Sequence, residues 1–194
     1  MARIILQMMI SVDGMVSGGD LDWIAKDEPL IQDHKLRLEQ ASAVLLGKGA
    51  CTEMSGYWKK AEHDEHCEPP MREIGRLMNQ VRKVVYSHKD MSVDWRNAQV
   101  HVVENDQALS RDVQHLKRET DGTLLVYGGV RLARSFLQQG LLDEIHLDIC
   151  PIILGAGQPL FTDSKQRTRL RLKKSLAYES GATKMHYEVL KASG

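Results

Sequence analysis

The sequence predicts a three-layer α/β fold, in which helices cover both faces of a mostly parallel central sheet and an antiparallel C-terminal hairpin forms one edge. Three observations predict this fold. Short apolar runs, typical of strands buried on both faces, alternate with segments of helical periodicity. Two of these runs lead directly into glycines, at Gly47 and at Gly128-Gly129. The last two β segments alternate apolar and polar residues around a short turn, as antiparallel edge strands do.

The first half of the chain predicts three strands and two helices. Residues 3–10 form an apolar strand, which is expected to be central because both of its faces are apolar. The other predicted elements are a helix over 29–40, a strand over 43–46, a helix over 70–79 and a strand over 83–87. Pro70 fits the first turn of its helix. The polar, acidic stretch 55–68 predicts an exposed loop, and Gly18 and Gly19 predict a mobile one.

The second half predicts a strand over 100–103, a helix that Asp106 caps, a strand over 123–127 and a helix from Val130. Gly140 stands where a left-handed residue would end that helix. A further strand over 142–149 ends before Pro151. Segments 169–178 and 184–190, joined by a turn over 179–183, form the edge hairpin.

Composition excludes several classes of protein. The 194 residues fit one domain spanning 1–194, with no linker or repeat. Lys plus Arg and Asp plus Glu both number 26, so no charge excess points to nucleic acid or a membrane surface. The three cysteines form no Cys-x-x-Cys pair, and no apolar run is long enough to span a bilayer. We therefore expect a soluble, cytoplasmic protein.

One cluster has the residue types of a metal site. His63, His66 and Cys67 offer nitrogen and sulfur ligands, but they lie in a polar segment without a second pair of ligands elsewhere. A solvated loop explains them more simply, so we expect no metal.

The ends of the parallel strands are where a ligand is expected to bind. At Gly128-Gly129 a strand runs through two glycines into a helix, which lets the backbone approach a ligand and directs first-turn amides at an anion such as a pyrophosphate. The same pattern also serves as an ordinary tight turn. The motif becomes specific only with the residues around it.

The Gly128-Gly129 turn lies within a longer motif, which spans residues 123–161. Over this stretch the chain resembles the C-terminal signature of the dihydrofolate reductase-like superfamily. The greatest resemblance is to the reductase domain of the bifunctional riboflavin-biosynthesis deaminase/reductase and to its stand-alone relatives. The matching positions are Gly128, Gly129, Leu132, Leu137, Gly140, Leu141, Asp143, Glu144, Pro151, Gly155, Gly157 and Phe161.

The resemblance implies an NADPH site at the strand ends. Its expected residues are Gly47, Lys48, Ser87, His88, Gly128, Gly129 and Val130. Four positions depart from the family. Relatives have Arg and Thr where this chain has Lys48 and Ala50, and the riboflavin-pathway enzymes have Glu where this chain has Tyr127. Relatives also have Arg, which meets the 2′-phosphate of NADP, where this chain has His88. Lysine keeps the charge but loses the bidentate fork.

The substrate is expected to lie near the end of the first strand. There Ser11, Asp13 and Gly14 resemble the family's Ser-x-Asp-Gly turn, and we expect Asp13 to be the catalytic polar anchor and Ser11 to bind substrate. An Asp-Gly β-turn without further role is the alternative. Trp23 either walls the pocket or packs in the core. Glu28, with Asp27, either helps to protonate a pterin or only caps a helix dipole.

By resemblance, the chain is expected to be an NADPH-dependent reductase of a 5-amino-6-ribosylaminouracil phosphate or a related heterocycle, and to form a homodimer through its C-terminal hairpin. The substrate is a small molecule. One alternative is a dihydrofolate or pterin reductase. The other is a nucleotide-binding module with this fold and little turnover, which the departures at Lys48, Ala50 and Tyr127 motivate.

Overall fold

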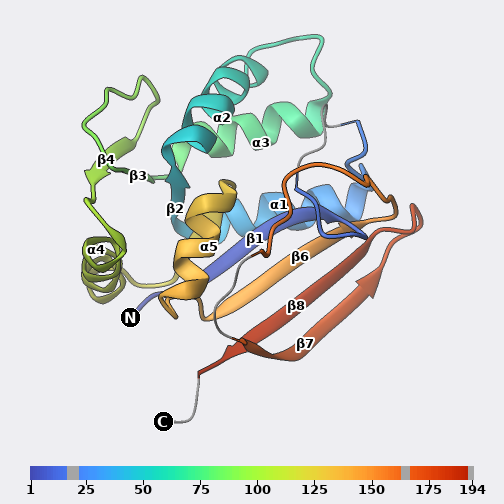
Figure 1. The fold of residues 1–194 in the computed structure, drawn as a ribbon. Helices are drawn as coiled ribbons and strands as arrows, with labels where there is room; N and C mark the ends of the chain where they lie inside the picture. Colours follow the sequence, from blue (N-terminus) through green and yellow to red (C-terminus); the bar gives the residue numbers. More distant parts are fainter. Residues whose placement is uncertain (17–21, 163–166, 192–194) are drawn as a thin grey trace.

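The computed structural model describes residues 1–16, 22–162 and 167–191, so Gly18 and Gly19 lie outside the described residues. Its centre is an eight-stranded sheet with the order β4-β3-β2-β5-β1-β6-β8-β7 (Figure 1). The strands are β1 (Arg3–Ser11), β2 (Ala41–Gly47), β3 (Lys83–Ser87), β4 (Ala98–Val102), β5 (Thr123–Tyr127), β6 (Glu144–Cys150), β7 (Arg169–Ala177) and β8 (Thr183–Leu190).

The pairing confirms the predicted sheet. β1 lies between β5 and β6, and Gln7 is in register with Tyr127 on one side and His146 on the other. All neighbours from β4 to β6 are parallel, whereas β8 is antiparallel to both β6 and β7. The carboxyl ends of β2, β3 and β5 therefore meet at one edge of the sheet.

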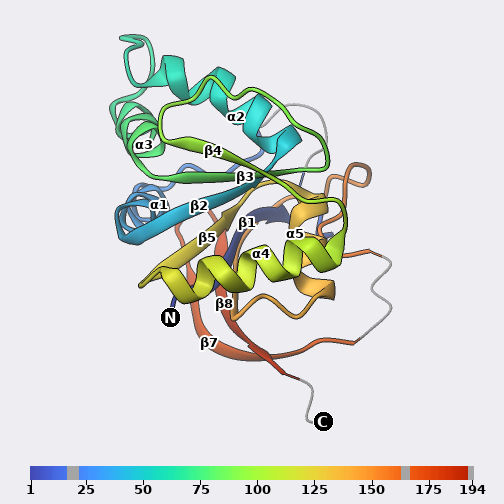
Figure 2. The same ribbon diagram turned by 90° about the vertical axis from the view of Figure 1, so that its left-hand side faces the viewer.

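Helices cover both faces of the parallel part (Figure 2). On one face lie α1 (Glu28–Gln40), α2 (Lys48–Ala61) and α3 (Pro69–Gln80), and on the other lie α4 (Asp106–Glu119) and α5 (Val130–Gln138). Each face has its own apolar core. Val113 and Phe136 belong to the core under α4 and α5, and Leu38 and Met78 belong to the core under α1 and α3. Buried on both faces, the central strands need the continuous apolar runs that the sequence shows.

Local signals set most helix ends. Pro residues occupy the first turns of α1 and α3, where a missing backbone donor costs nothing. Asn105, not Asp106, is the N-cap of α4, and its side chain accepts a hydrogen bond from Ala108 N at 2.9 Å. After α5, Gly140 has φ 63°, which is the left-handed conformation that the sequence predicts there.

The prediction of an exposed loop over 55–68 is wrong for its first half. α2 continues to Ala61, and only the segment between α2 and α3 is irregular. Ala61 is buried, and a Cβ added at Gly75 of α3 would lie 3.0 Å from Glu62 N. The close approach of α3 thus holds this polar stretch as helix, although its own sequence has little apolar periodicity.

At the opposite edge, the hairpin of β7 and β8 extends beyond the helices (Figure 1). All nine residues of β7 are exposed. No helix among the described residues is long and apolar enough to cross a bilayer.

Candidate functional site

A cleft of about 1130 Å³ opens where β2, β3 and β5 end. All seven residues that the sequence assigns to a cofactor line this cleft, although they come from three separate segments. They are Gly47, Lys48, Ser87, His88, Gly128, Gly129 and Val130. Their gathering follows from the parallel sheet, because successive strands deliver their carboxyl ends to the same edge.

Two helices point their N-termini at this cleft. α2 begins at Lys48 directly after β2, and α5 begins at Val130 after the glycine turn. Neither helix has a side chain that caps its first amides. Amides of a first helical turn have no partner within the helix, and the helix dipole adds partial positive charge there. The two N-termini together form a strong site for an anion.

The turn between β5 and α5 requires glycine. Gly128 and Gly129 have φ 81° and 88°. A Cβ on Gly128 would lie 3.3 Å from Met54 Sδ, and one on Gly129 would lie 3.4 Å from Ala50 Cβ. Alanine at position 50 therefore allows α2 to approach the turn closely. The result is a cradle of bare backbone between two helix N-termini.

The charge around the cleft favours a polyanion. The described residues that line it include three exposed cations, Lys48, Lys89 and Arg131, and two carboxylates, Glu53 and Asp106. At the end of β3, the Ser87 hydroxyl donates to Lys89 O at 2.7 Å and accepts from Lys89 N at 3.2 Å. This compact loop places His88 and Lys89 at the rim.

At the end of β1, one side chain and two backbone amides donate hydrogen bonds to Asp13. Its carboxylate accepts hydrogen bonds from Ser11 Oγ at 2.6 Å, Leu154 N at 3.2 Å and Gly155 N at 2.9 Å. The bond from Ser11, followed by the amide of Gly155, holds the pKa of Asp13 below its ordinary value. Asp13 is therefore an ionised acceptor that ties the loop after β6 to the end of β1.

The other residues assigned to the substrate are not among the described residues that line the cleft. Glu28 is exposed at the start of α1. Trp23 is half-buried, and its indole Nε1 is buried with no hydrogen-bond partner in the described structure. Asp27 binds the turn of the C-terminal hairpin, where its Oδ1 accepts from Ser180 N at 3.0 Å. The structure thus brings the residues assigned to a cofactor together in one cleft, whereas Ser11, Asp13, Trp23 and Glu28 are not among the residues that line it.

A network of buried polar side chains lies on the α1 side of the sheet, directly behind the glycine turn. The sequence alone did not predict this network. His34 of α1 contacts Tyr127 Oη at 3.3 Å through Nδ1 and Asp148 Oδ2 at 2.8 Å through Nε2. Burial raises the pKa of Tyr127 to about 12. Burial alone would raise the pKa of Asp148, but the hydrogen bond from His34 and nearby cations hold it below its usual range.

The same network continues around Arg37 of α1. Its Nε lies 2.5 Å from Asp33 Oδ2, and the same oxygen forms an ion pair with Lys184 Nζ at 2.5 Å. Its two terminal nitrogens lie 2.6 Å from His146 Nδ1 and 2.7 Å from His186 Nε2. Because arginine can only donate, both imidazole atoms must be acceptors. This arrangement clamps α1 to β6 and β8.

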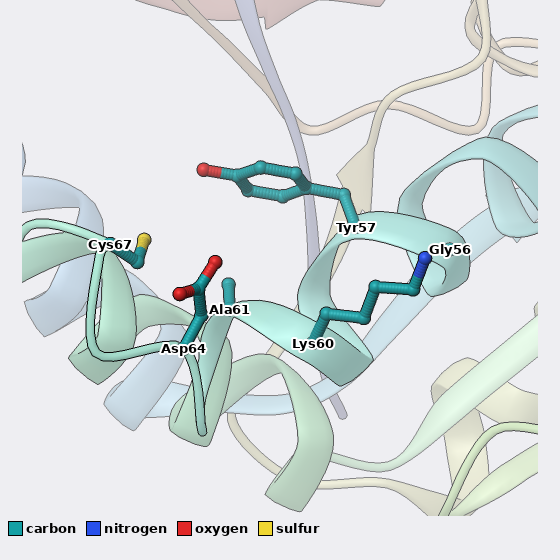
Figure 3. A pocket seen from close by; sticks show the side chains of 6 residues that line it. All are labelled: Gly56, Tyr57, Lys60, Ala61, Asp64 and Cys67. Carbon is teal, nitrogen blue, oxygen red and sulfur yellow. The ribbon is translucent and has the colours of Figure 1, made fainter.

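A second, smaller pocket of about 370 Å³ lies at the far end of α2 (Figure 3). Tyr57 extends over it towards Asp64 and Cys67, whereas the Lys60 side chain turns the other way. α2 spans 14 residues, so this pocket lies roughly 20 Å from the helix N-terminus that faces the cleft. The described residues contain no group of three or more His, Cys, Asp or Glu side chains arranged to hold a metal ion.

The sheet order, the glycine turn and the strand-end cleft define a protein of the dihydrofolate reductase-like class. In agreement, dihydrofolate reductase from Enterococcus faecalis, solved with NADP(H) and RAB-propyl, superposes with a TM-score of 0.62 at 12% identity, covering 97% of each chain. The bifunctional deaminase/reductase of Thermotoga maritima superposes with a TM-score of 0.66 at 16% identity, covering 97% of this chain and 57% of that one.

Within this class, the chain belongs to the RibD C-terminal domain family, whose model matches residues 2–184. A curated relative is the uncharacterized protein YyaP of Bacillus subtilis. It is 32% identical over 188 residues, which are 95% of this chain and 94% of the relative.

Proposed function

We propose that this protein is an NADPH-dependent reductase of the 5-amino-6-(5-phosphoribosylamino)uracil type or of a related heterocycle. The observation that carries the proposal is the convergence of two uncapped helix N-termini on a glycine turn inside one strand-end cleft. Family membership supports a reductase, and the Thermotoga relative is named for reduction of that pyrimidine.

The residues of the cleft fit a dinucleotide. Gly128, Gly129 and Val130 would hold the pyrophosphate with backbone amides, and Gly47 and Lys48 would approach it from the start of α2. Ser87 and His88 would contact the adenosine end. When bound, NADPH supplies hydride, so the protein needs only to orient the reactants, exclude water and provide a proton route.

For the substrate end we propose Ser11, Asp13, Trp23 and Glu28. Asp13 acts there as a positioning group, because its ionised carboxylate shapes the loop at Leu154 and Gly155. Trp23 offers a buried donor that a bound carbonyl would satisfy. A pterin reductase, in which Glu28 assists protonation, remains the second candidate, and a nucleotide-binding module with little turnover the third.

The test is NADPH oxidation with purified protein. We expect oxidation with 5-amino-6-ribosylaminouracil 5′-phosphate and a lower kcat for Asp13→Asn at unchanged NADPH affinity. Oxidation with dihydrofolate alone, blocked by an antifolate, would establish the pterin candidate. NADPH binding without oxidation of either compound would leave the nucleotide-binding module.

We also propose that the protein is cytoplasmic and forms a homodimer through β7. Edge strands with unpaired backbone groups pair readily with a second chain. Leu170 and Leu172 of β7 are 39% and 50% exposed, and a second chain paired along this edge would cover them.

Leu172→Asp should convert the dimer into a monomer, because a charge would be buried at the strand-to-strand contact. Sedimentation should give twice the 21.9 kDa chain mass for the wild type and the single mass for the variant. Leu36→Asp is the matched control, since Leu36 on α1 is also 50% exposed. A wild type that sediments as a monomer would refute this proposal.

A further inference from the structure

Asp27 stands at the N-cap of α1, but its side chain does not cap the helix. Its backbone has φ −60° and ψ 136°, the extended conformation typical of an N-cap, yet its carboxylate makes no capping hydrogen bond. Instead Oδ1 accepts from Ser180 N at 3.0 Å, and Oδ2 accepts from the Ser180 hydroxyl. At the start of α4, by contrast, Asn105 accepts from Ala108 N of its own helix. The carboxylate of Asp27 thus joins α1 to a turn 153 residues away in the chain.

Ser180 belongs to the turn between β7 and β8, which is well anchored. Ala182 of this turn is fully buried, and its amide donates to Ser180 Oγ at 3.2 Å. The hydroxyl that binds Asp27 is therefore itself held in place. A Cβ added at Gly181 would lie 3.5 Å from Pro151, so the turn packs against the residue that follows β6. The hairpin turn offers α1 a fixed point of attachment outside the helix.

Asp27 ends the irregular segment that leads into α1, and this segment carries residues that we assign to the substrate. Trp23 lies within it, and Glu28 follows Asp27 directly. The backbone of the segment also contacts β6, where Ala25 N donates to Cys150 Sγ at 3.4 Å. Sulfur is a weak acceptor, whereas a carboxylate makes strong, charge-assisted hydrogen bonds. Of these two attachments, the one to the hairpin turn is therefore the stronger.

The Asp27 side chain has an alternative partner in its own helix. Pro29 has no N–H, so the amide that this carboxylate could cap is that of Leu30, the third residue of α1. Ser180 now uses both carboxylate oxygens, so capping requires the side chain to rotate away from the turn. A cap at Leu30 would offset part of the lost contact in overall stability. The segment before α1 would nevertheless lose its attachment to the hairpin.

We propose that the turn of the C-terminal hairpin is part of the substrate site, where Ser180 positions Trp23 and Glu28 by holding Asp27 away from the helix cap. This inference rests on the proposed function, because it takes those two residues as contacts of the substrate. Ser180 is a positioning residue, since it acts through Asp27. The cleft that we assign to NADPH is lined from other strand ends, so cofactor binding does not depend on this contact.

Steady-state kinetics of Ser180→Ala test the positioning role. The KM for 5-amino-6-ribosylaminouracil 5′-phosphate should rise on the order of two- to tenfold, the effect of one hydrogen bond, while the NADPH dissociation constant from calorimetry stays unchanged. Asp27→Ser should raise KM similarly, because serine can cap α1 but has one oxygen of shorter reach. Ser180→Thr keeps the hydroxyl and should restore the wild-type KM. Ser175→Ala, at an exposed serine of β7 in the same hairpin, should behave as wild type.

Amide hydrogen exchange gives a readout that needs no turnover. In Ser180→Ala the amides of residues 23–26 should exchange faster, whereas the amide of Leu30 should exchange more slowly because Asp27 now caps it. An unchanged KM, or unchanged exchange over residues 23–26, would overturn the positioning role and leave the proposed function in place. A wild type that oxidises no NADPH with this substrate would contradict the proposed function, and this inference with it.

Discussion

Acidification from pH 7 to pH 5 should lower the free energy of unfolding by on the order of 2–3 kcal/mol through two histidines, of which His146 is buried and His186 is half-buried. His146 and His186 stack with ring centroids 3.9 Å apart, and both face the guanidinium of Arg37. Burial, followed by the charge of Arg37, lowers the pKa of His146 to about 3. Burial, followed by the neighbouring His146, lowers the pKa of His186 to about 4.

The direction follows from proton counts. Between pH 6.5 and about 4 the unfolded chain binds protons at these two rings, and the folded protein does not. Stability is therefore complete above pH 6.5 and declines as the pH falls through this window. Protonation would also place two cations against Arg37 and break the contacts that clamp α1 to β6 and β8.

Denaturant unfolding at pH 7, 6 and 5 tests this expectation. The double variant His146→Gln, His186→Gln keeps an amide acceptor for Arg37 without a titrating ring, so its unfolding free energy should be lower at pH 7 but nearly constant down to pH 5. His115→Asn should retain the wild-type slope, because His115 is exposed. A wild type equally stable at pH 7 and pH 5 would contradict this account of the network.

Gly129→Ala should weaken NADPH binding on the order of 100-fold, while the protein stays folded. Alanine at φ 88° is strained by about 1–3 kcal/mol, and its Cβ would crowd Ala50 at 3.4 Å. The turn can relieve this strain only by moving, and movement would misdirect the amides that we propose for the pyrophosphate.

Gly140→Ala is the matched control for that variant. Gly140 also has a positive φ, at 63°, but a Cβ there would meet nothing within 4 Å, and the residue does not line the cleft. It should lose roughly 1 kcal/mol of stability and keep its NADPH affinity. Calorimetric titration of both variants gives the comparison, and equal affinities would refute the role of the glycine turn.

The central sheet was predictable because the sequences of its strands are continuously apolar, which indicates burial on both faces. The continuous apolar runs of β1 and β5 have few alternatives to a core position, and the glycines and prolines mark the ends of elements. The half of α2 that was predicted as loop lacked such a signal. Its polar residues become helical because α3 packs closely against them, which is a tertiary effect.

The gathering of the residues assigned to a cofactor was also predictable, because a parallel sheet brings the carboxyl ends of its strands to one edge. The network under α1 was not. In β6 and β8 polar residues alternate with apolar ones, a pattern that ordinarily predicts one solvent-exposed face. Here α1 covers that face with Asp33, His34 and Arg37. The sequence does contain complementary charges on α1, β6 and β8. That these charges contact one another follows only from the fold.

A crystal structure with bound NADPH tests the central claim most directly. We expect the pyrophosphate on the amides of Gly129 and Val130, the adenosine end beside Ser87 and His88, and the nicotinamide towards the end of β1, where Met8 and Val16 line the cleft. NADPH bound elsewhere, for example in the pocket at Tyr57 and Cys67, or with its pyrophosphate away from the glycine turn, would contradict it.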